Sequence, residues 1–161
     1  MTDKMTAFTS SVVTDLLDRE SVQYKVLHHS GIAKTIEEAA SQRGVAPDQM
    51  VKSILLRDMS GFHVLACLPG SASVDPKKVR AVFGCKRMTC ADSSQVKSVT
   101  GFSPGTVTPV ALKTWLPVVF DNALESNKKV NISSGTQLAG LELEFNDLVT
   151  LCNPMFADIS R

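Results

Sequence analysis

The segment Gly101 to Pro109, Gly-Phe-Ser-Pro-Gly-Thr-Val-Thr-Pro, holds two glycines and two prolines in nine residues. Proline fixes φ and removes a backbone donor, whereas glycine lets the backbone pass close to a ligand. The N–H groups of Gly105, Thr106 and Val107 could therefore converge on one acceptor, which is the chemistry of an oxyanion hole or a phosphate-binding nest. The alternative is a rigid surface turn, and a Pro/Gly loop taken alone favours that alternative.

A lysine at position 52 lies inside an apolar run, Val51 to Leu56. On a strand, Lys52 shares a face with Ile54 and Leu56, and both faces of such a strand are largely apolar. The side chain either snorkels from a sheet edge or points its ammonium into a cleft, where it needs a carboxylate, phosphate or carbonyl partner. The spacing alone leaves both interpretations open.

Other polar candidates lie on or just after apolar runs. Glu142 and Glu144 alternate with apolar residues, which is the ordinary pattern of a half-exposed strand. Asp121 ends an apolar run, where a carboxylate more often caps a turn or helix than acts as a catalytic acid. Ser133 and Ser134 bring hydroxyls to a flexible Ser-Ser-Gly-Thr segment, and a hairpin loop explains them equally well.

The sequence offers no pattern for a metal site or a familiar nucleophile. His28 and His29 lack the i, i+4 spacing and the cysteine or carboxylate neighbours of a metal site, so no metal is expected. The cysteines also lack metal spacing, and Cys67 lies in an apolar run where a thiol behaves as a small hydrophobe. GxSxG, HExxH, P-loop and GxGxxG motifs are absent, which leaves the common serine hydrolases, zinc proteases and nucleotide enzymes without motif support.

Length and composition indicate a single domain. With 161 residues and 43% hydrophobic content, we expect one domain over residues 1–161 with one continuous core. The formal charge of +1 does not favour binding along a whole duplex or to an anionic membrane, although contact with a nucleic-acid end is compatible with it. No apolar run approaches the roughly 18 residues of a membrane span. The four cysteines form no CxxC pair and no leader precedes them, so a reduced, cytoplasmic protein is expected.

Caps and turn residues predict the elements that must position these side chains. Helices are expected after Thr9, from Thr35 to Gly44, from Asp75 to Gly84, from Asp92 to Gly101 and after Asn146. Strands are expected at 24–27, 50–57, 62–68, 86–89, 117–121, 129–133, 140–145 and 156–159. Because helices and strands mix without βαβ alternation, we predict an α+β fold with a mixed, mainly antiparallel sheet flanked by helices.

Several segments occur in an order that is typical of one family. They are Val-Lys-Ser-Ile-Leu-Leu, the later Leu-Pro-Gly and Val-Asp-Pro-Lys-Lys-Val, and then Thr-Gly-Phe-Ser-Pro-Gly-Thr-Val-Thr-Pro. In these segments the chain resembles the YbaK/ProX family of free-standing aminoacyl-tRNA deacylases, which are related to the editing domain of bacterial prolyl-tRNA synthetases. The resemblance runs from about Tyr24 to Ile159, nearly the whole chain.

The resemblance implies hydrolysis of the ester between a wrong amino acid and the 3′ adenosine of a transfer RNA, with no metal or other cofactor. Lys52 matches the family's functional lysine, which would hold the terminal phosphate or polarise the ester. Gly105 matches the glycine at the reacting carbonyl, and the amides of Gly105 and Thr106 would stabilise the developing oxyanion. The attack would be substrate-assisted, by water activated through a ribose hydroxyl or, for cysteinyl esters, by the substrate's own thiol.

The resemblance also implies a set of substrate-binding residues. Ser133 or Ser134 corresponds to a small-residue loop beside the pocket. Glu142 falls where cysteinyl-specific members carry an aspartate, and His29 falls near a position that they fill with tyrosine. Asp121 is added to the expected substrate-binding residues from its place at the end of a strand, and not from the resemblance.

The substrate is expected to be a mischarged tRNA that carries Ala, Cys, Ser or Thr. The Pro-Gly-Thr-Val-Thr-Pro loop looks closer to alanyl-specific deacylases, whereas Lys-Ser-Ile-Leu-Leu and Phe-Ala-Asp-Ile look closer to cysteinyl-specific ones. A synthetase partner could supply selectivity for the tRNA. The alternatives are a non-catalytic module that binds an aminoacyl or nucleotide end, and a hydrolase of some other small ester.

Overall fold

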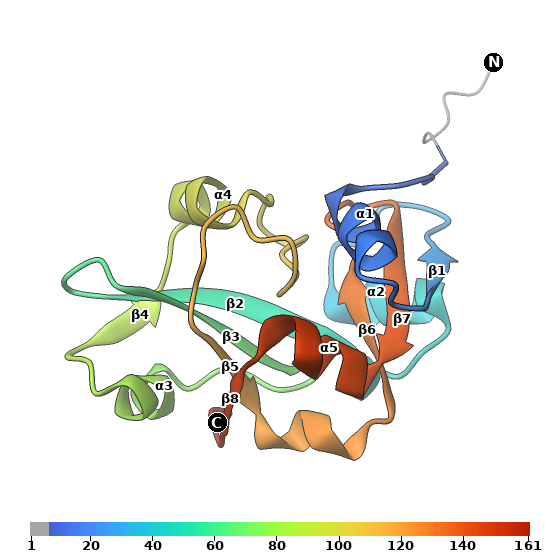
Figure 1. Ribbon diagram of the computed structural model, residues 1–161. Coiled ribbons are helices and arrows are strands. Elements are labelled where there is room, and N and C mark those ends of the chain that lie inside the picture. Colours follow the sequence, from blue (N-terminus) through green and yellow to red (C-terminus); the bar gives the residue numbers. More distant parts are fainter. Residues whose placement is uncertain (1–6) are drawn as a thin grey trace.

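The computed structural model describes residues 7–161, which fold into helices packed on two β-sheets (Figure 1). The smaller sheet is antiparallel, in the order β1 (Tyr24–His28), β7 (Ala139–Glu144) and β6 (Lys129–Ser133). The larger sheet has the order β4 (Met88–Cys90), β2 (Val51–Asp58), β3 (His63–Pro69), β5 (Val118–Asp121) and β8 (Met155–Ala157). The pairs β3–β5 and β5–β8 are parallel, so this sheet is mixed.

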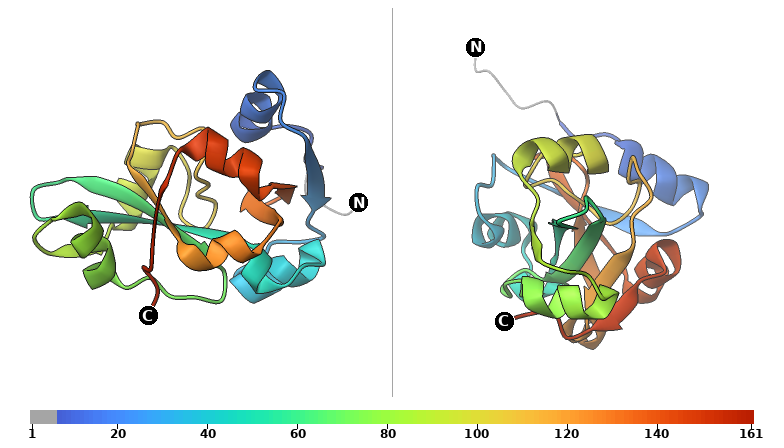
Figure 2. Two further views of the ribbon diagram at one scale, coloured as in Figure 1. Left: turned by 60° about the horizontal axis from the view of Figure 1, so that its bottom comes forward. Right: turned by 90° about the vertical axis from the view of Figure 1, so that its left-hand side faces the viewer.

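Five α-helices surround these sheets within the described part of the chain. They are α1 (Val12–Arg19), α2 (Ile36–Arg43), α3 (Pro76–Phe83), α4 (Ser93–Thr100) and α5 (Phe145–Cys152), with short 3-10 helices at Pro47–Gln49 and Asn122–Ser126. Helices α3 and α4 lie on opposite sides of the β2–β3–β4 region (Figures 1 and 2). No helix among residues 7–161 combines the length and the apolar character that a bilayer crossing requires.

The predicted α+β class is confirmed, but the strands form two sheets where one was expected. An isolated parallel bridge between Met50 and Asn131 is where the start of β2 meets β6. One apolar cluster includes residues of β2, β3 and β5 from the larger sheet and of β6 and β7 from the smaller one. The two sheets therefore share a core, which the strand pattern of the sequence did not reveal.

The β2–β3 hairpin forms as its turn residues predicted. Strands β2 and β3 pair in register from Val51 opposite Pro69 to Arg57 opposite His63. The Asp58 carboxylate accepts hydrogen bonds from the backbone N–H groups of Ser60 and Phe62 at 2.9 and 2.8 Å. Both faces of this hairpin are buried, because one apolar cluster packs against each side of the two strands.

Two helix starts differ from the prediction because tertiary contacts decide them. Helix α1 is capped by Ser11 and not by Thr9. The Ser11 hydroxyl accepts from the first-turn amides and donates to the carbonyl of Ser134 at 2.7 Å, far along the chain. Helix α5 begins at Phe145, one residue before Asn146, since buried Phe145 packs into the shared core and its N–H donates to the Lys128 carbonyl.

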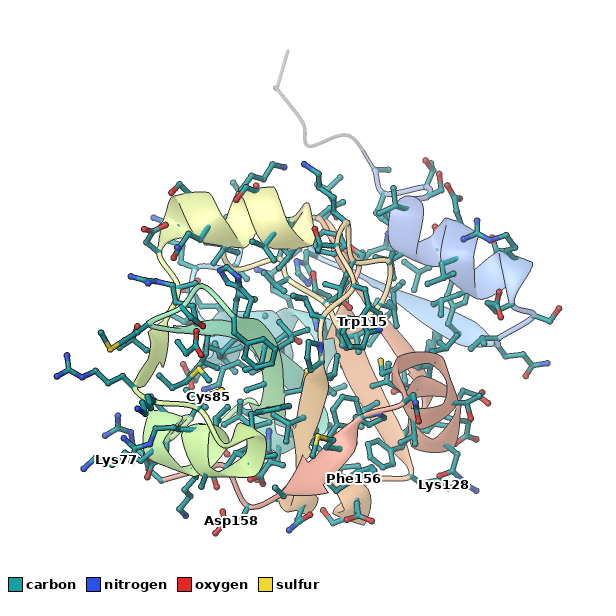
Figure 3. The ribbon with its side chains drawn as sticks, turned by 60° about the vertical axis from the view of Figure 1, so that its left-hand side comes forward. Lys77, Cys85, Trp115, Lys128, Phe156 and Asp158 are labelled. Carbon is teal, nitrogen blue, oxygen red and sulfur yellow. The ribbon has the colours of Figure 1, made fainter. Side chains whose placement is uncertain are left out.

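The connection from α4 to β5 contains the segment 101–109 and then crosses the surface. Gly101 ends α4 in the left-handed conformation, as its position predicted. Further along, Trp115 is 83% exposed (Figure 3). Lys113 returns to the helix end, where its N–H donates to the Thr100 carbonyl at 3.0 Å. This hydrogen bond anchors the connection to the end of α4 before the chain enters β5.

Asp121 has a structural position, which corrects the expectation that it binds substrate. It is 3% exposed at the end of β5. One carboxylate oxygen accepts from the N–H of Ala123 at 3.0 Å, and the other accepts from the N–H of Ile159 at 2.9 Å. The carboxylate therefore caps a 3-10 helix and holds the segment after β8.

Replacing Asp121 by Ala should lower the free energy of unfolding by about 2 kcal/mol, because the buried N–H of Ile159 loses its acceptor. Chemical denaturation with urea measures the effect. Glu125→Ala, an exposed position in the same 3-10 segment, is the matched control and should change stability little. Equal stability of the two variants would contradict the structural role.

Candidate active site

A cavity of about 510 Å³ lies where four segments that are distant in sequence meet. Its walls come from His29, residues 32–36, Ala39 and Arg43, from residues 50–54 at the start of β2, from residues 104–107, and from residues 133, 136 and 137. The cavity thus brings together Lys52, Gly105, Thr106, His29 and Ser133 of the predicted site.

The loop 104–107 is held in place from both sides. The N–H and the hydroxyl of Thr106 both reach the Ser103 carbonyl, at 3.0 and 2.8 Å. The Thr106 carbonyl in turn accepts a hydrogen bond of 2.8 Å from the hydroxyl of Ser133. These contacts close the loop on itself and fasten it to the end of β6.

The pinned loop leaves two amides on the cavity without an internal acceptor. Gly105 has φ of +88°, a conformation that strongly favours glycine. Its N–H and that of Val107 donate to no group of residues 7–161, and both residues line the cavity. The N–H of Thr106 was expected to act with Gly105 but is already occupied by Ser103. Gly105 and Val107 are therefore the amides available to a ligand.

Lys52 follows the second of the two alternatives that its sequence position left open, a cleft with a carbonyl partner. It lines the cavity, and its Nζ donates to the carbonyl of Ala72 in the loop after β3. Burial lowers the pKa of Lys52, and the negative charge of Glu37 opposes that shift. No carboxylate of the described chain lies within 4 Å of the ammonium, so it stands beside the cavity with a neutral partner.

His29 is fixed in one tautomer by two hydrogen bonds. Its Nε2 is 3.0 Å from Nε of Arg43, which can only donate, so Nε2 is the acceptor. The other ring nitrogen, Nδ1, carries the proton and lies 2.8 Å from the carbonyl of Gln137. Burial lowers the pKa of His29, the Gln137 carbonyl raises it, and the charge of Arg43 lowers it. The imidazole is therefore neutral and has no ring nitrogen free to accept a proton.

The predicted serine and acidic positions divide between site and scaffold. Ser133 lines the cavity and is hydrogen-bonded to Thr106. Ser134 is fully buried, and its hydroxyl bonds the Ala139 carbonyl at 2.6 Å, which closes the β6–β7 turn. Glu142 is half-buried on β7 opposite Asn131 and does not line the cavity. The structure thus does not bring Ser134 or Glu142 to the cavity wall.

Sequence reasoning missed Arg43, Thr136 and Gln137, which also line the cavity. Arg43 lies in the last turn of α2, where a basic residue is explained by the helix dipole alone. Thr136 and Gln137 belong to the turn between β6 and β7. Polar residues are common in turns, so their types gave no sign of a binding site. The one residue in the sequence that relates to the position of Arg43 is Gly140 on β7. Any other residue there would have a Cβ that overlaps the Arg43 guanidinium.

The cavity walls offer no activated nucleophile. No cysteine lines the cavity, burial raises the pKa of Cys67 to about 12, and burial likewise raises that of Cys152. No Asp or Glu is among the lining residues, and both ring nitrogens of His29 are engaged. Across residues 7–161, no three His, Cys, Asp or Glu side chains gather as they would around a metal ion. The wall supplies hydrogen-bond donors and positive charge.

Residues 31–151 match the model of the aminoacyl-tRNA editing domain. The chain is 32% identical over 98 residues to a proline--tRNA ligase of Bacillus licheniformis, a match that covers 61% of this chain but 17% of the ligase. It is 23% identical over 124 residues to the "Putative Cys-tRNA(Pro)/Cys-tRNA(Cys) deacylase EbsC" of Enterococcus faecalis, which covers 77% of this chain and 76% of that protein.

Solved structures share the whole fold. A "putative trans-editing enzyme for prolyl tRNA synthetase" superposes with a TM-score of 0.83 at 26% identity, over 96% of this chain and 99% of that chain. The protein described as "hypothetical protein APE2540" gives a TM-score of 0.86 at 28% identity, over 94% and 100%. The arrangement of two sheets is therefore common to these proteins.

We expect the pKa of His29 to lie below the ordinary value of about 6.5 and to rise in Arg43→Gln, which removes the adjacent positive charge. NMR titration of the imidazole Cε1 protons measures it. Because the folded state disfavours the protonated ring, the stabilisation from His29 is present above pH about 6.5 and declines as the pH falls below it. Arg57→Gln, outside the cavity wall, is the control. A pKa of His29 that Arg43→Gln leaves unchanged would contradict the pairing.

Proposed function

Since the chain belongs to the aminoacyl-tRNA editing domain family, we propose that it is a trans-editing deacylase that hydrolyses the ester of mischarged aminoacyl-tRNA. In the reaction a water oxygen bonds to the ester carbonyl carbon, the bond from that carbon to the ribose oxygen breaks, and a proton passes to the ribose oxygen. The products are the free amino acid and tRNA with its 3′ hydroxyl restored.

The observation that carries this proposal is the unpaired amide of Gly105 on the cavity wall. A tetrahedral intermediate places negative charge on the former carbonyl oxygen, and a fixed amide donor stabilises that charge without reorganising. Val107 supplies a second unpaired amide two residues on. The bonds of Thr106 to Ser103 and Ser133 keep the loop in place, so the donors are preorganised.

Lys52 adds a positive charge at the same cavity. A cation close to the developing oxyanion lowers the energy of the transition state more than that of the neutral ester. Desolvation strengthens this interaction, because charges in a partly buried site are less screened than in water. The Ala72 carbonyl orients the ammonium, and no carboxylate of the described residues forms an ion pair with it.

The attack is proposed to be assisted by the substrate itself. A serine or cysteine nucleophile needs a nearby base, and the cavity wall has no carboxylate and no free imidazole nitrogen. A ribose hydroxyl of the terminal adenosine would hold the attacking water next to the carbonyl. In a cysteinyl ester the substrate's thiol would itself bond to the carbonyl carbon as the bond to the ribose oxygen breaks and that oxygen takes the thiol's proton, and water would then hydrolyse the cyclic thioester that is left. The protein then contributes orientation and charge stabilisation.

The amino acid removed is proposed to be small, with Ala, Cys, Ser and Thr as the candidates. One relative carries a name that refers to Cys-tRNA, and several relatives are proline--tRNA ligases. Part of the wall next to Lys52 is apolar, with Ile36, Met50 and Val51, and suits a small side chain. The nearly neutral chain suits contact with the acceptor end alone, with a synthetase as a proposed partner for tRNA selection.

Lys52→Ala should reduce deacylation by about 10²–10³-fold, because the transition state loses its nearest cation. The assay is release of amino acid from tRNAs charged with Ala, Cys, Ser, Thr and Pro. The fold should persist, since the one hydrogen bond of the ammonium goes to the Ala72 carbonyl. Lys25→Ala, an exposed lysine on β1, is the matched control. Full activity of Lys52→Ala would remove the lysine from the mechanism, and no release from any tRNA by the wild type would favour a binding module.

Gly105→Ala should lower kcat by about 10-fold or more with a smaller change in KM, because it shifts an amide that acts in the transition state. An added Cβ meets no atom within 4 Å, so the effect arises from the backbone at φ of +88°. Gly61→Ala is a close control, since Gly61 has φ of +89° and equally open space on the distant β2–β3 turn. Similar losses of kcat in both variants would show a general loss of stability.

A further inference from the structure

Arg43 extends from the last turn of α2 across the face of β7 and reaches the cavity. Its path depends on Gly140, which is buried on β7 and has no side chain to block it. A Cβ at Gly140 would overlap the guanidinium and the carbon next to it. The guanidinium is therefore seated against the sheet and is not a freely moving surface group.

One edge of this guanidinium is fixed and the other is free. Nε donates to Nε2 of His29 at 3.0 Å, and the Gln137 carbonyl holds that imidazole from its other side. The terminal Nη groups of Arg43 donate to no acceptor in the described chain. His29 thus orients the plane of the guanidinium and leaves its two-pronged donor edge available.

The charge of Arg43 has no counter-ion in residues 7–161. The one ion pair found there joins Lys78 to Asp158 on the surface next to α3, where Figure 3 labels Asp158. Burial lowers the pKa of Arg43 to about 10, which leaves the side chain charged at neutral pH. Partly burying a guanidinium without a carboxylate is costly, and a structural role would normally supply one.

The charged side chains that line the cavity are all cationic, and Glu37, whose charge acts on Lys52, is not part of the wall. Lys34, Arg43 and Lys52 line the cavity, and no aspartate or glutamate does. A chain with a formal charge of only +1 has therefore gathered three cations around one cavity. Such a wall favours an anionic ligand and disfavours the α-ammonium of an aminoacyl group near Arg43.

We propose that the free edge of Arg43, oriented by His29, binds a phosphate group of the nucleotide end that enters this cavity. The assignment rests on the proposed function, in which that end belongs to tRNA, and it leaves Lys52 to act on the ester. A guanidinium presents two parallel donors to a phosphate, which a lysine does not. Arg43 is then a binding residue that sets the direction of the substrate, with the ammonium of the amino acid turned away from it.

Binding of AMP compared with adenosine tests the phosphate site without any turnover. By calorimetry, the wild type should bind AMP about 10-fold or more tightly than adenosine, the size of effect expected for a charge-assisted pair. Arg43→Gln should remove this preference, because it weakens AMP binding more than adenosine binding. Arg43→Lys should restore it only in part, because the donor fork is lost. Arg57→Gln, outside the cavity wall, should behave as the wild type.

Gly140→Ala is a second variant that keeps every charge. It should displace the guanidinium and weaken AMP binding while circular dichroism stays native. The proposal is overturned if the wild type binds AMP and adenosine equally or binds neither, or if Arg43→Gln retains the preference. It is also overturned if Lys52→Ala abolishes the preference for AMP and Arg43→Gln does not. Competition by acetate but not by inorganic phosphate would likewise overturn it, because the site would then bind a carboxylate.

The outcomes separate this inference from the proposed function. Deacylation by the wild type together with an AMP preference that ignores Arg43 would refute the phosphate site alone. An Arg43-dependent AMP preference without release from any charged tRNA would refute the deacylase and retain the phosphate site.

Discussion

The burial of apolar side chains between the two sheets is the constraint on which the site depends. Strand β2 supplies Val51 and Leu55 to the shared core, and β6 supplies Val130 and Ile132 from the other sheet. This packing holds the start of β2 against β6, and the cavity lies at that junction. Lys52 alternates with the core positions, so the same register that buries its neighbours directs its ammonium to the cavity wall.

Charged groups in this protein differ in how many of their polar atoms are hydrogen-bonded: both oxygens of Asp121 are, but of Arg43 only Nε is. The carboxylate of Asp121 accepts two backbone hydrogen bonds and belongs to the scaffold. Lys52 and Arg43 are partly buried, line the cavity and contact only neutral groups. A desolvated charge with a neutral partner is poorly compensated, and a ligand of opposite sign offsets that cost. Hydrogen bonding and burial, more than residue type, therefore distinguish the binding cavity from the scaffold.

Caps and turn residues predicted most of the helices and strands, but tertiary contacts set the starts of α1 and α5. Helix α2 is capped at its start by the Thr35 side chain and at its end by Gly44 in the left-handed conformation. Helix α1 starts at Ser11 instead of Thr9 because the Ser11 hydroxyl also bonds the turn after β6. In α5, burial of Phe145 sets the first residue. A cap is predictable when its partner is local, and it is not when the partner is over 100 residues away.

The sequence by itself determined the α+β class, the β2–β3 hairpin and the nomination of Lys52 and Gly105, because these follow from alternation, turn residues and ordered motifs. Only the tertiary structure decided which polar groups share the cavity. In the tertiary structure the Arg43 guanidinium packs over Gly140 and donates a hydrogen bond to His29, and the amide of Thr106 is already bonded to Ser103. The physical reason is that hydrogen-bond partners and burial arise from segments far apart in the chain, and no local pattern specifies them.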